Sequence, residues 1–226
     1  MTEALVRSRI FGKDDKPTIY YIVGFRMKIK QFEVHIRALT LAGFRVVAFD
    51  SNPAVLTKGN PELLAQAMAQ FLTIIKADVQ GRTIAGAYGI SLGSFFALNV
   101  LALPEVPRAA LNTGGGSILQ AVWEMDVLGW VKQKYVDKGF SRSDVGKAWN
   151  PVDISQNTHK IAGKSLLAAA SYADEFVPID DALRHYKEWQ EDGVKAQLDI
   201  YKHLKHKQLI ILNLLRIGKT AKFFKS

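Results

Sequence analysis

The most informative stretch of the sequence covers residues 83–103 and reads TIAGAYGISLGSFFALNVLAL. Residues 83–88 are small, β-branched or aromatic, which predicts a strand buried within a sheet. Residues 92–103 are apolar and predict a buried helix. Between them GISLG, at residues 89–93, matches the pattern G-x-S-x-G. Glycines two positions from the serine let neighbouring backbones pass close to a strained turn, so we expect Ser91 on a sharp turn between strand and helix.

Strands and helices alternate on both sides of this stretch. Further strands are expected at residues 4–11, 18–23, 44–49, 108–112, 164–171 and 196–201, the first of them at a sheet edge. Further helices are expected at residues 28–42, 61–78, 179–190 and 207–217. The alternation predicts an α/β fold with a mostly parallel central sheet and helices on both faces.

Residues 117–150 interrupt the alternation. They carry Trp123, Trp130 and Trp149 among charged residues and have a helical pattern, so we expect a small helical insertion between two strands. The tryptophans would cover a binding site, pack the insertion itself, or do both. A length of 226 residues indicates a single domain over residues 1–226, with 117–150 as a cap insertion.

The composition is that of a globular protein and restricts the possible chemistry. Hydrophobic residues make up 48% and charged residues 23%, a balance that argues against disorder. The sequence has no cysteine, which excludes disulfides, thiolate metal sites and a cysteine nucleophile. It contains no clustered metal-ligand pattern and no glycine-rich nucleotide motif, so we expect neither a metal nor a cofactor.

The net charge of +9 is concentrated near the C-terminus. Residues 201–226 hold seven basic residues and no acidic residue, which leaves +2 for the other 200 residues. A basic face across the whole domain is absent, so we expect no nucleic-acid partner. We expect Leu209, Leu212, Leu215 and Ile217 to pack on the sheet with the lysines in water, and therefore no membrane contact. No signal peptide or membrane span is predicted, which favours a cytoplasmic protein.

With a strand before it and an apolar helix after it, the G-x-S-x-G pattern resembles the nucleophile turn of the α/β-hydrolase superfamily. The resemblance extends from about residue 18 to the last predicted helix. It implies the α/β-hydrolase fold with Ser91 as nucleophile, followed along the chain by an acid and then a histidine. Residues 171–178, SYADEFVP, are similar to the family's acid loop, in which an aspartate precedes Val-Pro by three residues. The resemblance therefore implies that Asp174 is the acid.

The histidine of the family follows the last strand, where this sequence offers His203 and His206. We favour His206 because it lies just before the final predicted helix, as the family's histidine does, and keep His203 as the alternative. The other three histidines, His35, His159 and His185, do not fit the family order.

An oxyanion hole is implied at the backbone N–H groups of Leu92 and Phe25. Leu92 follows the nucleophile, and Phe25 lies in the loop after the strand at residues 18–23. That loop reads Val23-Gly24, so it lacks the His-Gly of many relatives and the HGGG motif of some lipases and esterases. No particular esterase subfamily is therefore implied.

Together these residues predict a serine hydrolase that cleaves a carboxylic ester, thioester or related acyl bond of a small molecule. Two alternatives stay open. One is an acyltransferase that uses the same three residues, and the other is a non-catalytic small-molecule receptor or scaffold on the hydrolase fold.

Overall fold

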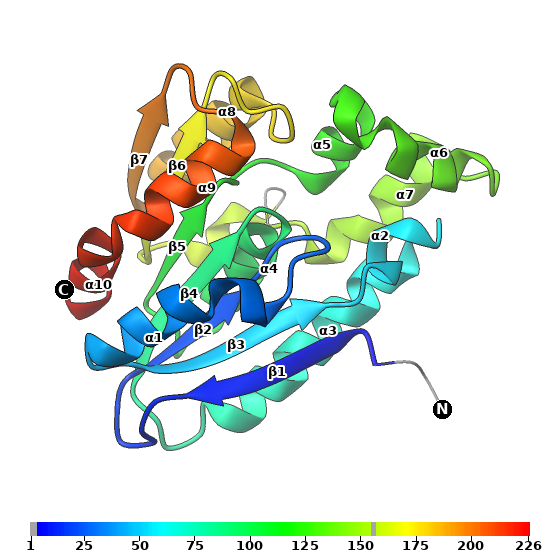
Figure 1. Ribbon diagram of the computed structural model, residues 1–226. Helices are drawn as coiled ribbons and strands as arrows, with labels where there is room; N and C mark the ends of the chain where they lie inside the picture. Colours follow the sequence, from blue (N-terminus) through cyan, green and yellow to red (C-terminus); the bar gives the residue numbers. More distant parts are fainter. Residues whose placement is uncertain (1–3, 155–156) are drawn as a thin grey trace.

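The structure is a computed structural model that describes residues 4–154 and 157–226, and its centre is a seven-stranded sheet (Figure 1). The strand order is β1-β3-β2-β4-β5-β6-β7. β1 pairs antiparallel with β3 at one edge, and the other five pairings are parallel. The strands are β1 (Val6–Phe11), β2 (Thr18–Ile22), β3 (Arg45–Ser51), β4 (Ile84–Ile90), β5 (Arg108–Asn112), β6 (Ser165–Ser171) and β7 (Lys195–Tyr201). The predicted fold class is confirmed.

Helices cover both faces of the sheet (Figure 1). One face carries the short 3-10 helix η1 (Ile29–Phe32), α1 (Glu33–Leu41), α9 (His206–Leu215) and α10 (Ile217–Lys225). The other carries α3 (Glu62–Asp78), α4 (Leu92–Leu101) and α8 (Ile179–Glu191). The sequence of β2 explains this separation, because successive side chains of a strand point to opposite faces. Ile19 and Tyr21 pack towards α1, whereas Tyr20 and Ile22 pack towards α3.

The C-terminal segment differs from its prediction. Two helices, α9 and α10, stand where one was expected, and the chain turns between them at Arg216. After this turn Ala221 and Phe224 of α10 are buried against the sheet, and Leu215 is left 76% exposed. The prediction that Leu215 packs on the sheet is therefore wrong. Within residues 4–154 and 157–226, no helix has the length and hydropathy needed to cross a membrane.

Residues 117–150 are helical and lie between β5 and β6. Their helices are α5 (Ile118–Glu124), η2 (Asp126–Leu128), α6 (Gly129–Val136) and α7 (Arg142–Trp149), and η3 (Asn150–Val152) leads out of the insertion. Trp149 is buried, and its Nε1 donates to the Pro61 carbonyl at 2.9 Å, beside the start of α3. Tyr135 packs edge-on against Trp149 with ring centroids 5.7 Å apart. These two aromatic residues therefore pack the insertion and attach it to the body.

Trp130 of α6 has a different place from Trp149, because it meets the loop that follows β2. Its ring lies 6.0 Å from the Phe25 ring, and the Arg26 guanidinium lies 4.6 Å above it. The described residues also include two short helices, α2 (Ala54–Thr57) after β3 and η5 (Thr158–Ile161) before β6. Through Trp130, the insertion contacts the loop that was expected to supply an oxyanion donor.

Candidate active site

Ser91 occupies a strained turn between β4 and α4. Its φ of 53° and ψ of −122° are rare for a residue with a side chain. The flanking glycines make this turn possible. A Cβ on Gly93 would lie 2.1 Å from the Ile22 carbonyl oxygen, and a Cβ on Gly89 would lie 2.4 Å from the Gly93 carbonyl oxygen. No side chain fits at either position, which is the steric requirement that the G-x-S-x-G pattern predicts.

His206 is the first residue of α9, and its ring reaches the serine. The distance from His206 Nε2 to Ser91 Oγ is 3.0 Å, within hydrogen-bond range. The His206 backbone N–H donates to Glu175 Oε2 at 3.1 Å, so this carboxylate satisfies a free N–H group at the start of the helix. Phe176 packs against the imidazole with ring centroids 4.7 Å apart, and His206 is only 4% exposed.

Asp174 lies in the turn after β6 and holds the other side of the imidazole. His206 Nδ1 is 2.9 Å from both Asp174 Oδ1 and Oδ2. The backbone N–H groups of Phe176 and Val177 also donate to Asp174 Oδ1, at 2.8 and 3.1 Å. The carboxylate can only accept, so Nδ1 carries the proton and Nε2 is left to accept from the Ser91 hydroxyl.

The structure thus brings together the three residues predicted as catalytic, and it separates them from the other histidines. His203 is exposed in the turn after β7. His35 is on the buried face of α1, where burial lowers its pKa to about 4. His185 lies on α8 and is fully buried beside Asp181, with His185 Nε2 3.3 Å from Asp181 Oδ1. His206 has the geometry of a base for Ser91.

Of the two predicted oxyanion donors, Leu92 is next to the serine along the chain, and Phe25 lies in a loop that packs against the serine. Leu92 opens α4, so its N–H lies at the positive end of a ten-residue helix. Gly24, the residue before Phe25, is packed against the serine, since a Cβ on Gly24 would lie 3.0 Å from Ser91 Cβ. Both Phe25 and Leu92 are half-buried. The donor role of their N–H groups stays a prediction.

Asp181, a buried carboxylate of α8, has a role that its place in the sequence does not reveal. Besides standing in the first turn of α8, Asp181 accepts a hydrogen bond from the Ser117 N–H at 2.7 Å. Ser117 Oγ donates to Asp153 Oδ2 at 2.8 Å, so the two stems of the insertion are bonded to each other and to α8. Burial alone would raise the pKa of Asp181, but its hydrogen bonds from His185 and Ser117 hold it below the ordinary value. These partners are far apart in sequence, so no local pattern could predict them.

Comparison with known proteins finds likeness in structure and not in sequence. No family model matches the chain, and no curated protein matches it. A Pyrococcus horikoshii acylaminoacyl peptidase structure is similar at TM-score 0.71 and 15% identity, over 98% of this chain and 42% of that one. Another structure of this peptidase is covered to 39%, so the chain spans about two fifths of its length.

Two smaller enzymes are covered almost completely. The enol-lactonase from Burkholderia xenovorans LB400 is similar at TM-score 0.63 and 15% identity, over 98% of this chain and 96% of that one. A cold-adapted esterase from an Arctic intertidal metagenomic library is similar at TM-score 0.62 and 13% identity, over 97% of this chain and 88% of that one. With the strand order of the sheet and the turn at Ser91, these likenesses show that the chain has the α/β-hydrolase fold.

Proposed function

We propose that the protein is a serine hydrolase that cleaves a carboxylic ester, thioester or related acyl bond through an acyl-enzyme on Ser91. The observation that carries the proposal is the continuous contact from Asp174 through His206 to Ser91 Oγ, with 2.9 Å at one end of the imidazole and 3.0 Å at the other. A receptor has no need of this arrangement, which makes an alcohol nucleophilic.

The proposed reaction follows from the proton positions. His206 Nε2 takes the Ser91 hydroxyl proton while Oγ bonds to the substrate carbonyl carbon, and Asp174 stabilises the imidazolium that forms. The N–H groups of Leu92 and Phe25 would hold the oxyanion. His206 then gives its proton to the leaving group, and water activated by the same ring releases the acid. In an acyltransferase an alcohol, thiol or amine would replace this water.

Names of the similar proteins support an acyl substrate. They include a peptidase, two esterases, a lipase and an enol-lactonase, whose reactions all open a bond at an acyl carbon. The aromatic side chains of Phe25 and Trp130 beside the proposed oxyanion loop would favour a substrate with an apolar acyl or alcohol part.

A fluorophosphonate probe tests the proposal, because it phosphonylates an activated serine. We expect wild-type protein to be labelled and to hydrolyse p-nitrophenyl esters. Ser91→Ala should remain folded, take no label and lose roughly 10⁴–10⁶ in turnover. Adding an alcohol or thiol acceptor and measuring the transfer product separates a hydrolase from an acyltransferase.

His206→Ala and His203→Ala form a matched pair for the base. The first should abolish labelling and turnover, and the second, which changes an exposed histidine three residues away, should leave both at the wild-type level. Absence of labelling in folded wild-type protein would refute the proposal in favour of a receptor. Loss of activity in His203→Ala alone would move the base to that residue.

A further inference from the structure

A buried asparagine beside the site connects the strand that supports Ser91 to the helix that carries His206. Asn112 is the last residue of β5 and is 1% exposed. Its backbone carbonyl accepts from the Ser91 N–H at 3.0 Å, and in the β4–β5 register it stands opposite Ile90, the residue before the serine. Asn112 is therefore fixed directly to the turn that carries the nucleophile.

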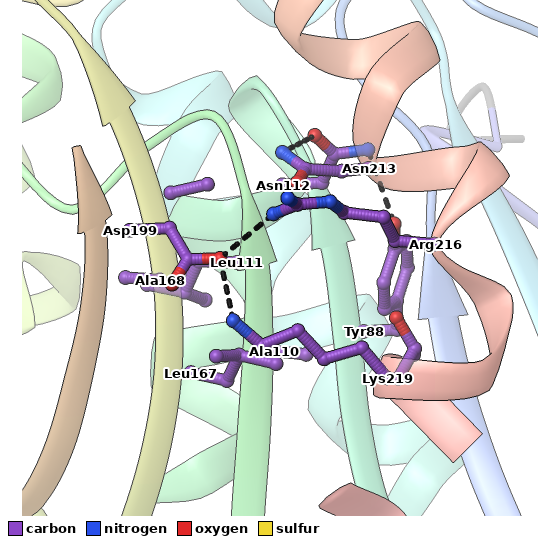
Figure 2. A pocket seen from close by; sticks show the side chains of 12 residues that line it. Tyr88, Ala110, Leu111, Asn112, Leu167, Ala168, Asp199, Asn213, Arg216 and Lys219 are labelled. Atoms are coloured by element: carbon purple, nitrogen blue, oxygen red, sulfur yellow. Dashed lines mark hydrogen bonds and ion pairs between the residues drawn. The ribbon is translucent and has the colours of Figure 1, made fainter. Parts of the chain in front are cut away.

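The side chain of Asn112 reaches in the other direction, to α9. Asn112 Nδ2 donates to the Ile210 carbonyl at 3.1 Å, and Asn112 Oδ1 accepts from Asn213 Nδ2 at 2.9 Å. Nδ2 also donates to the Tyr88 hydroxyl at 3.1 Å. Figure 2 shows Asn112 and Asn213 facing each other across the gap between the sheet and the helix. Both N–H donors of the amide are used, and two of its partners belong to α9, within seven residues of His206.

At its N-terminus α9 is also held by the bonds of His206 to Asp174 and Glu175, but the other contacts along the rest of the helix are less specific. Leu209 and Ile210 are buried in the core, but apolar packing is not directional and permits a helix to shift. Just after α9, Arg216 in the turn and Lys219 of α10 pair with Asp199, as Figure 2 shows, but these side chains are partly exposed. Exposed ion pairs contribute little to holding a geometry. The buried amide bonds of Asn112 are directional and shielded from water.

We propose that Asn112 is a positioning residue. Its hydrogen bonds prevent α9 from rotating about its axis or sliding relative to β5, and so keep His206 Nε2 within reach of Ser91 Oγ. The inference rests on the proposed function of those two residues. A side chain lies about 5 Å from its helix axis, so a rotation of α9 by about 10° would move the imidazole by nearly 1 Å. A misplacement of that size costs on the order of 100-fold in rate.

The test compares Asn112→Ala with Asn99→Ala. Asn99 of α4 is also buried, and its amide donates to the carbonyls of Phe95 and Val152 at 3.0 and 2.8 Å. Asn99 thus controls for the loss of a buried amide without a bond to α9. We expect both variants to lower the melting temperature. Only Asn112→Ala should lower kcat for a p-nitrophenyl ester by about 10- to 100-fold, with KM little changed.

Asn213→Ala is the second variant and removes one of the two bonds to α9 with less risk to folding, since Asn213 is half-buried. Its kcat should fall by less than that of Asn112→Ala. Combining the two substitutions should cost little more than Asn112→Ala alone, because the amides act on one contact. An additive loss, or a kcat of Asn112→Ala equal to that of Asn99→Ala, would overturn the proposal.

Proton NMR of the His206 Nδ1–H gives a readout that does not depend on turnover. We expect wild type and Asn99→Ala to show the same downfield, exchange-protected signal from the bond to Asp174, and Asn112→Ala to shift or broaden it. An unchanged signal in Asn112→Ala would refute the positioning role. If wild type gives the signal but is neither labelled nor active, the proposed function fails. The signal of Asn112→Ala then still tests whether Asn112 positions His206.

Discussion

Opposite ends of the parallel strands hold two buried charged groups that can be compared residue by residue. At the amino ends, Arg45 of β3 is 1% exposed and binds Asp78 at the end of α3 through two bonds, Nη1 to Oδ2 at 2.8 Å and Nη2 to Oδ1 at 2.7 Å. At the carboxyl ends, Asp174 binds His206. Both pairs join a carboxylate to a nitrogen group, and only the second is a candidate for catalysis.

The difference lies in what remains free after the pair has formed. Arg45 also donates to Asp14 and Thr18, and Asp78 accepts from Tyr20, so the pair is surrounded by further partners. Burial alone would raise the pKa of Asp78, but Arg45 holds it below the ordinary value. A guanidinium keeps its proton at any physiological pH.

The carboxyl-end pair is different because an imidazole can gain and lose a proton near neutral pH, and because its chain of contacts ends at a half-buried hydroxyl. Burial of charge therefore does not by itself distinguish a catalytic site from a structural one. A group that can exchange its proton and an end open to a ligand are also needed.

Among the changes that test this comparison, Asp174→Asn should have the largest effect. The amide cannot accept the Nδ1–H in the same way, so the imidazole would take the wrong tautomer or orientation, and kcat should fall by roughly 10⁴-fold. Ester hydrolysis measured beside thermal unfolding should show a large loss of rate with a small change in melting temperature. Glu175→Gln is the control, since Glu175 bonds the backbone of His206 and not its ring. A greater loss in Glu175→Gln than in Asp174→Asn would identify Glu175 as the acid.

Asp78→Ala should have the opposite effect, a large loss of stability with little change in the reactivity of Ser91. It leaves Arg45 buried without its main partner, which costs about 3–5 kcal/mol in the free energy of unfolding. Urea denaturation should record this loss, while the fraction of molecules that stays folded should be labelled by a fluorophosphonate at the wild-type rate. Replacing both residues, as Arg45→Met with Asp78→Leu, should recover much of the stability. A selective loss of labelling in folded Asp78→Ala would show that the two ends are coupled.

The two clusters also differ in how far the sequence predicts them. Ser91 lies in a turn that needs glycines, which is a local signal. Asp174 and His206 are implied by the resemblance to the family's acid loop and chain order, which leaves His203 as an alternative to His206. Arg45 and Asp78 are 33 residues apart, and neither stands in a recognisable pattern. The partners of a buried charge are set by how helices and strands pack, which no local signal contains.

The strands of the sheet are predicted from local sequence patterns, whereas the bounds of the C-terminal helices are not. The strand at residues 108–112 is predicted with the bounds that β5 has. The end of α9 has no glycine or proline to mark it, and Gly218 falls inside α10. The turn at Arg216 is explained by the burial of Phe224, a tertiary contact. Asn112 likewise meets residues about 100 positions later in the chain, so its role is visible only in the structure.

The smallest effect concerns His35, a buried ionisable group that belongs to neither cluster. Its Nδ1 lies 3.1 Å from the Tyr21 hydroxyl, and none of the described residues hydrogen-bonds its buried Nε2. Burial lowers its pKa to about 4. An unfolded chain protonates this histidine near its ordinary pKa of about 6.5, whereas the folded protein resists protonation until about 4. The free energy of unfolding should therefore fall as the pH drops between these values, by up to about 3 kcal/mol in all.

His35→Gln isolates this contribution, because glutamine does not titrate and can still bond Tyr21. Urea unfolding of both proteins at about pH 7, 5.5 and 4.5 should give a steeper loss of stability for wild type. His185 has the opposite pKa shift. Burial lowers its pKa, but the contact with Asp181 raises the pKa by more, so that it lies above the ordinary value. It is present in both proteins, so the difference between them reports His35 alone. Equal pH dependence in the two proteins would mean that His35 gains a proton as readily in the folded protein as in the unfolded chain. Its burial would then not lower the free energy of unfolding at acidic pH.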